Sequence, residues 1–283
     1  MSTKINHNVL ALTAQRNIWN TQNDLDTSLI RLSSGLRINY SWDDPAGLAI
    51  SERFRAQISS MEEAERNANY NINLMATAEG ALQTIDEKLV RLRSLAIQSS
   101  NGALTSTDRA ALDQEFQLLL SEITRIAESV NYNNLNLLNG SLSGDPNNAR
   151  SGLKFHVGVN NVFGQDYYYV TLGDMRASAL GLTGVNVLDT LAAQNALLSI
   201  DSAIEVKDTE RTRIGAYVSR LQGTIQNLQI ASENATSSES EIRDADIAKE
   251  MSEFTRAQLL MQTGVSMLAQ ANMVPQIVAQ LVG

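Results

Sequence analysis

The chain contains no cysteine, and this absence removes several kinds of chemistry at once. Disulfide bonds, thiolate metal sites and thiol nucleophiles are all excluded. Proline is scarce, with three residues in 283, and aromatic residues make up only 5% of the chain. Because few prolines interrupt a helix and few aromatic residues favour strands, this composition favours long helices.

Clustered basic residues are also missing, and the net charge is −9. Since proteins that bind nucleic acid neutralise phosphates with grouped Lys and Arg, we expect no nucleic-acid partner. The two histidines, His7 and His156, lie in unrelated segments without the spacing of a metal-binding pair. Glycines occur singly rather than in a phosphate-binding loop. We therefore expect no metal, no cofactor and no enzymatic activity.

No charged residue occurs from Ala257 to Gly283. This segment is long enough to span a bilayer. Its five glutamines and Pro275 argue against membrane insertion, because each amide would need a partner in hydrocarbon. Two interpretations remain. The segment is either a core helix of one compact domain or a helix that becomes ordered only when copies of the chain assemble, and we favour assembly. The apolar run Val9 to Leu12 is too short for a cleavable secretory signal.

One stretch, from Asp43 to about Ser99, carries the clearest helical pattern. Every seventh residue is apolar at Phe54, Met61, Ala68, Met75, Leu82, Leu89 and Ala96. A second apolar row interleaves at Ile58, Ile72, Ile85 and Leu92. This 3–4 spacing predicts a helix ~80 Å long with a seam for a partner helix. Asp43 and Asp44 are suited to cap its start, and Pro45 to begin it.

Shorter apolar rows predict the remaining helices. The first covers residues 1–36 and ends at Gly35, and another begins after Thr107 or Asp108. A further seam runs from about Leu188 and is interrupted at 237–240. The last helix spans 244–274, where Pro275 should end or bend it. On the first and last helices we predict that an assembly seam is formed by Val9, Leu12, Phe254, Met261, Val265 and Leu268.

The pattern changes to alternation between residues 153 and 172, which predicts one β-hairpin. The expected fold class is therefore mainly α, a long antiparallel helical bundle or coiled coil formed by both termini, with one small β-hairpin region. We expect two domains. Residues 1–36 and 244–283 form an inner helical domain, and residues 37–243 form an outer rod-like domain with long helices and the hairpin.

Several phrases of the chain resemble the signatures of one family. Residues 32–39 (LSSGLRIN) and 43–50 (DDPAGLAI) resemble the N-terminal signature of bacterial flagellins. Residues 213–216 (RIGA), 242–248 (IRDADIA) and 267–272 (MLAQAN) resemble the C-terminal signature. The resemblance covers about 1–140 and 190–283, so the segment between leaves room for the hairpin and connectors only. It implies a minimal flagellin that lacks the variable outer domains.

This resemblance implies a structural subunit that is exported unfolded through the flagellar type III channel and polymerises into the flagellar filament, giving a supercoiled propeller for motility. The implied partners are copies of itself, an export chaperone at the C-terminal region, and the filament cap and hook-associated proteins. Toll-like receptor five is a further implied partner, and the family positions for that contact, which also serve subunit packing, fall on Arg91, Leu95 and Glu115. Arg91 and Leu95 are expected to share one helix face.

The filament is expected outside the cell, or in the periplasm if the host is a spirochaete. Two other functions remain open. A hook-filament junction protein would share the terminal helices but would occur in few copies. A cytosolic coiled-coil adaptor would be a stable, fully folded dimer at low concentration.

Overall fold

The computed structural model describes residues 7–144 and 150–282, and for residues 274–282 it describes the backbone alone. The chain divides into two compact units. The terminal unit combines Met1–Ile58 with Glu233–Gly283, and the central unit is Ser59–Ser232. The domain boundaries expected from the sequence, at residues 36/37 and 243/244, remain a prediction.

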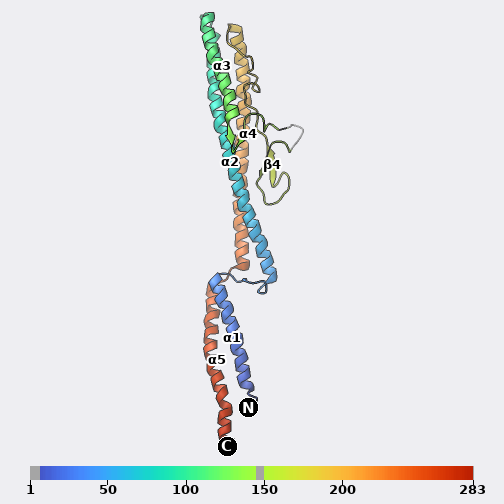
Figure 1. Ribbon diagram of the computed structural model, residues 1–283, viewed down its shortest axis with the longest axis vertical. Helices are drawn as coiled ribbons and strands as arrows, with labels where there is room; N and C mark the ends of the chain where they lie inside the picture. Colours follow the sequence, from blue (N-terminus) through green and yellow to red (C-terminus); the bar gives the residue numbers. More distant parts are fainter. Residues whose placement is uncertain (1–6, 145–149, 283) are drawn as a thin grey trace. The chain divides into compact units, whose positions relative to one another are not determined.

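Helices account for most of the described chain, as the sequence predicts (Figure 1). The elements in order are α1 (Val9–Ser34), α2 (Pro45–Ser99), α3 (Ser106–Ser129), β1 (Asn131–Tyr132), β2 (Leu135–Asn136), β3 (Leu153–His156), β4 (Tyr167–Val170), α4 (Thr190–Arg243) and α5 (Ile247–Val282). The mainly α fold class is confirmed.

Helix boundaries follow local hydrogen bonding. Gly35 ends α1 in a left-handed conformation, with φ of 72°, and its N–H donates to the Arg31 carbonyl at 2.8 Å. Asp44 caps α2 by accepting from the Gly47 N–H at 2.9 Å, and Pro45 is the first helical residue. These three predictions are confirmed.

Three boundary predictions need correction. Helix α3 is capped by Thr105 in a capping box with Asp108, rather than beginning after Thr107 or Asp108. Asp43 does not cap α2, because its carboxylate accepts N–H bonds in the preceding connector. The serines at 237–240 do not interrupt α4. Of the two outcomes expected at Pro275, the end of the helix is excluded, because the backbone of α5 stays helical to Val282, and the bend remains a prediction.

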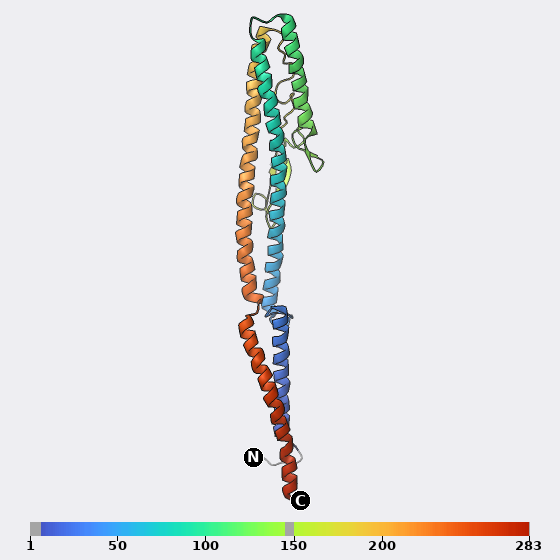
Figure 2. The same cartoon turned by 90° about the vertical axis from the view of Figure 1, so that its left-hand side faces the viewer.

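Helices α2, α3 and α4 lie side by side in the central unit (Figure 1, Figure 2). Side-chain hydrogen bonds and ion pairs show that α2 and α4 run antiparallel. From the start of α2 to its end, each successive residue is bonded to a residue nearer the start of α4. The bonds join Glu65 to Gln229, Glu79 to Arg211, Asp86 to Lys207 and Arg93 to Asp201. One continuous hydrophobic core lies between the three helices and extends to Phe155 and Tyr168 of the hairpin.

The predicted hairpin is present as the antiparallel pair β3–β4, with Leu153 opposite Val170 and His156 opposite Tyr167. The expectation of a single hairpin was wrong. Strands β1 and β2 form a second, two-residue antiparallel pair. Its connecting residues Asn133 and Asn134 have φ of 49° and 63°. Two consecutive asparagines in this conformation are typical of a type I′ turn, which is the signal that could have revealed this hairpin.

Candidate functional site

Helices α1 and α5 pack against each other as an antiparallel pair, named here the terminal helix pair. Asn8 caps α1 and its side-chain amide donates to the Ala271 carbonyl at 2.8 Å. At the other end, Arg31 lies 3.8 Å from the Glu250 carboxylate. The two helices therefore run in opposite directions along the length of α1.

The seam between α1 and α5 alternates small residues with a few large apolar ones. Partly or fully buried positions on α1 are Ala11, Ala14, Ile18, Thr21, Leu25, Ser28, Arg31 and Leu32. The corresponding positions on α5 are Phe254, Ala257, Met261, Gly264, Leu268 and Ala271. The helices come close at Gly264, where an added Cβ would lie 2.9 Å from Cγ1 of Ile18. Small residues let the backbones approach, but they bury little apolar area.

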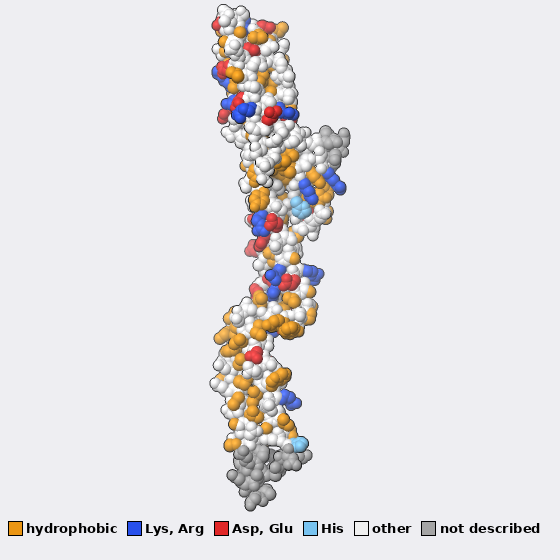
Figure 3. All heavy atoms as spheres, viewed as in Figure 1, with side chains coloured by type: hydrophobic (Ala, Val, Ile, Leu, Met, Phe, Trp, Pro, Cys, Tyr) orange, Lys and Arg blue, Asp and Glu red, His pale blue; other side chains and the backbone are white. Residues whose placement is uncertain are grey.

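Large apolar side chains instead cover the outside of the pair. Those exposed on α1 and α5 are Val9, Leu10, Leu12, Trp19, Leu29, Ile30, Ile247, Met251, Leu259, Leu260, Val265, Met267 and Met273. Figure 3 shows hydrophobic side chains spread over the surface of α1 and α5 with isolated charged groups between them. Large exposed apolar surfaces in soluble proteins are typical of interaction sites, so the pair has the character of one.

In the part of the terminal unit that the structure describes, no extended core is present. Among its described residues, the buried hydrophobic ones are Ile38, Ala235 and Ala257, whereas the core described above lies entirely within the central unit. A segment that buries so little apolar surface gains little to offset the entropy of ordering its chain.

The structure divides the predicted assembly seam into two groups. Phe254, Met261 and Leu268 are partly buried and belong to the seam with α1. Val9, Leu12 and Val265 lie outside it, with exposed fractions of 63%, 62% and 54%. The second group is therefore available to another molecule, and its role in assembly remains a prediction.

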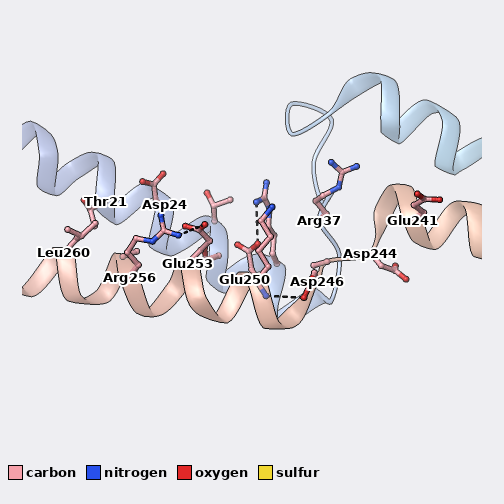
Figure 4. Close-up of a pocket in the computed structure, with 16 residues that line it drawn as sticks. Thr21, Asp24, Arg37, Glu241, Asp244, Asp246, Glu250, Glu253, Arg256 and Leu260 are labelled. Carbon is pink, nitrogen blue, oxygen red and sulfur yellow. Dashed lines mark hydrogen bonds and ion pairs between the residues drawn. The ribbon is translucent and has the colours of Figure 1, made fainter.

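Open grooves border the terminal helix pair, and two of them adjoin at Thr21 and Leu260, which line both. The apolar groove has a volume of about 360 Å³ and includes Leu10, Leu260 and Met267 in its lining. The polar cleft, of about 650 Å³, lies where α5 begins (Figure 4). Here Asp246 accepts from the Ala248 and Lys249 N–H groups at 2.9 and 3.1 Å. Charged residues are thus gathered at this end of α5, before the uncharged run that starts at Ala257.

The residues expected to contact an innate receptor belong to the central unit, and the structure separates them. Arg91 on α2 and Glu115 on α3 form an exposed ion pair, with Nη2 and Oε1 2.7 Å apart. Leu95 is fully buried in the core. The expectation that one exposed helix face presents both Arg91 and Leu95 was therefore wrong, because Leu95 points toward the partner helices of α2.

Other kinds of site are not visible in the described part of the chain. No group of three His, Cys, Asp or Glu residues there is placed to hold a metal ion. Within the same residues, every helix is too short or too polar to cross a membrane. His156 stacks on Tyr167, with ring centroids 5.8 Å apart and planes 9° from parallel, as a packed strand residue does.

Comparison with known proteins agrees with the motifs. Residues 5–143 match the family model of the bacterial flagellin N-terminal helical region, and residues 197–282 match that of the C-terminal helical region. The chain is 43% identical to a flagellin of Halalkalibacterium halodurans, over 98% of each chain. It is 39% identical to the flagellar filament 33 kDa core protein of Treponema phagedenis, over 98% of this chain and 99% of that one.

One solved structure shares the fold at low identity. It is that of a putative flagellar hook-associated protein from Vibrio parahaemolyticus, with a TM-score of 0.57 and 16% identity, covering 71% of this chain and 100% of that chain. This likeness concerns the fold alone. The two family regions together cover most of the chain, and relatives match it over nearly its full length. The chain belongs to the bacterial flagellin family.

Proposed function

We propose that this chain is the structural subunit of a flagellar filament and that the terminal helix pair carries its polymerisation. The observation that supports this most directly comes from the described residues of the terminal unit, which expose large apolar side chains and form no extended core. Copies of the chain would cover these faces. The relatives named as flagellin and as a flagellar filament core protein have nearly the same length as this chain.

The apolar surface of α1 and α5 favours assembly. Full burial of one Leu, Val, Ile or Met side chain contributes about 1.5–3 kcal/mol. The exposed set on α1 and α5 is roughly half covered already, so hiding the rest contributes on the order of 10 kcal/mol per subunit. That amount is comparable to the whole stability of a folded domain. Neighbouring copies would therefore supply the core that the terminal unit lacks.

The same surface bears on export. A terminal unit with little core of its own is expected to unfold easily, as passage through a narrow export channel requires. The uncharged residues after Arg256 would associate prematurely if left uncovered in the cell, so we assign them to an export chaperone before secretion. At the growing end, the filament cap and hook-associated proteins are the corresponding partners. The filament lies outside the cell, or in the periplasm if the host is a spirochaete.

Arg91 and Glu115 are the surface residues that we assign to innate-receptor contact or subunit packing. Both are exposed and paired with each other, so a partner would meet the guanidinium and the carboxylate side by side. Leu95 would support α2 from beneath rather than touch the partner. Exchanging the two charges, Arg91→Glu with Glu115→Arg, should keep the pair but abolish receptor activation. Unchanged activation would overturn the assignment to receptor contact.

Electron microscopy of the concentrated, salt-treated protein tests the filament function. A variant lacking residues 254–283 should leave the central unit folded by circular dichroism and should form no filaments. Leu12→Asp should raise the concentration needed for polymerisation, whereas Asn20→Asp adds the same charge to an exposed polar position of α1 and serves as the matched control. Filaments of normal yield from the truncated chain would contradict the proposal.

A junction protein and a cytosolic adaptor are less well supported. A junction protein would occur in few copies, so the abundance of the chain in sheared filaments distinguishes it from the main subunit. An adaptor would be a fully folded dimer at low concentration. Limited proteolysis of the monomer should instead remove about 40 residues from each end.

A further inference from the structure

The connector between α1 and α2 presents an aromatic pair to solvent. The rings of Tyr40 and Trp42 are stacked, with centroids 4.6 Å apart and planes 12° from parallel. Tyr40 is 44% exposed and Trp42 is 75% exposed. The chain has only two tryptophans, so an indole in this position is a conspicuous use of a rare residue. Exposed aromatic pairs have a large area to bury and are frequent anchors of protein interfaces.

The backbone beneath the pair is held by hydrogen bonds. The Asp43 carboxylate accepts from the N–H of Asn39 at 3.0 Å and of Tyr40 at 2.9 Å, and the Asp43 N–H donates to the Tyr40 carbonyl at 3.1 Å. Ile38 is buried below the connector. These two N–H groups, that of Tyr40 first and then that of Asn39, lower the pKa of Asp43 because they donate to its carboxylate.

The connector is also tied to the segment that precedes α5. The Arg37 N–H donates to the Arg243 carbonyl at 2.7 Å, and the Ala245 N–H donates to the Gly35 carbonyl at 2.9 Å. The Arg37 guanidinium donates to the Ile242 carbonyl at 2.6 Å. An anchor that is fixed before binding loses little conformational entropy when it binds, which increases its contribution to affinity.

The chemistry around the pair indicates what covers it. The charged groups of the connector are engaged within the chain, since Asp43, Asp44 and Arg37 all bond to backbone groups. The side chains that project to a partner are therefore mainly the two aromatic rings. Their exposed area is matched by another apolar surface. Such a surface exists in the same unit, on the outside of the terminal helix pair, where charged residues are absent from Ala257 onward.

We propose that the Tyr40–Trp42 pair is an anchor that docks on a second copy of this chain, against the apolar surface that α5 presents in its uncharged part from Ala257 onward. The proposal rests on the filament function argued above and names a specific contact within it. The pair would lie in the middle of a subunit interface, fixing where the connector of one copy sits on the helices of another.

Hydroxyl-radical footprinting of the unaltered protein tests the contact. Oxidation of Trp42 and Tyr40, followed by mass spectrometry in monomer and polymer, should slow at least about fivefold on polymerisation if their exposed area is covered, as expected of an interface anchor. Equal oxidation rates in monomer and polymer would overturn the proposal. Because this measurement uses the natural sequence, it does not depend on whether a variant folds.

Substitutions provide the second test. Trp42→Ala should raise the critical concentration for polymerisation about tenfold, the factor that corresponds to loss of one interface anchor. Trp42→Phe keeps an aromatic ring in place and should raise it much less. Equal critical concentrations for all three proteins would overturn the anchor while leaving the filament function intact. Failure of the unaltered chain to polymerise at any concentration would instead overturn the filament function.

Discussion

The seam between α2 and α4 contains a polar layer, and removing one side of it is the most informative perturbation of the central unit. Lys207 occupies a seam position and is only 2% exposed. Its ammonium group contacts the carboxylate of Asp86 across the seam and that of Asp208 at 2.7 Å on its own helix. Burial acts to lower the pKa of Lys207, but the hydrogen bonds to Asp208 and Asp86 outweigh it and raise the pKa above the usual value. The lysine is therefore buried in its charged form.

The cost of Asp86→Ala follows from this geometry. Breaking a fully buried ion pair destabilises a protein by about 3–5 kcal/mol, whereas an exposed pair is worth about 0–1 kcal/mol. The Asp86 side chain is 32% exposed and Asp208 remains beside the lysine. The loss should therefore be intermediate, about 2–3 kcal/mol. For a unit of this size that corresponds to a fall in melting temperature of roughly 5–10 °C.

Urea denaturation of the monomer, followed by circular dichroism, measures this loss. Asp201→Ala is the matched control, because it removes the aspartate of the exposed Arg93–Asp201 pair on the same two helices and should cost less than about 1 kcal/mol. The double variant Asp86→Leu, Lys207→Met should recover most of the lost stability, since no charge is left buried. Equal losses for Asp86→Ala and Asp201→Ala would refute the reasoning.

Three further predictions concern the central unit. The Tyr168 hydroxyl is buried and has no hydrogen-bond partner among the described residues. Tyr168→Phe should therefore raise the free energy of unfolding by about 1 kcal/mol in urea titrations. A fall in the free energy of unfolding of similar size would show that the hydroxyl is hydrogen-bonded. The N–H groups of Asn160 and Val162 hold the pKa of Asp166 below its ordinary value of 3.8. Because the pKa of Asp166 is lower in the folded state than in the unfolded state, the ionised carboxylate stabilises the fold. This contribution is complete at pH values above the ordinary pKa and is lost as the pH falls through the folded-state pKa. NMR titration of the carboxyl group would detect the lowered pKa. Gly164 has φ of 84° with open space around it, whereas Gly80 lies exposed in α2. Gly164→Ala should lower the free energy of unfolding by about 1 kcal/mol, and Gly80→Ala should raise it by about 0.5–1 kcal/mol. A change of the same sign for both variants in thermal unfolding would contradict the conformational argument.

Local signals account for the features that sequence reasoning predicted correctly. Gly35, Asp44 and Pro45 act within one or two turns of the backbone, so their effect does not depend on distant contacts. The β3–β4 hairpin has alternating apolar residues, a pattern that a helix cannot use. The short β1–β2 pair has too few residues to show alternation, and only its Asn133–Asn134 turn marks it.

Side-chain exposure was harder to predict, because a 3–4 apolar pattern does not specify which neighbour covers it. On α1, small residues such as Ala11 and Ala14 form the seam, while Val9 and Leu12 face outward. The hydrophobicity of Val9 and Leu12 predicts burial, and this prediction holds only if other copies of the chain cover them. Leu95 is the opposite case. A residue placed by resemblance on a binding face is buried here, because its position in the heptad of α2 faces the core.

The central claim is that the terminal helix pair becomes stably folded by burying its apolar surface among copies of the chain. Amide hydrogen exchange, measured on monomer and filament by mass spectrometry, tests this most directly. The account predicts rapid exchange in α1 and α5 of the monomer, strong protection of both in the filament, and protected α2–α4 core amides of the central unit in both states. Equal protection of α1 and α5 in the monomer and in the filament would contradict it.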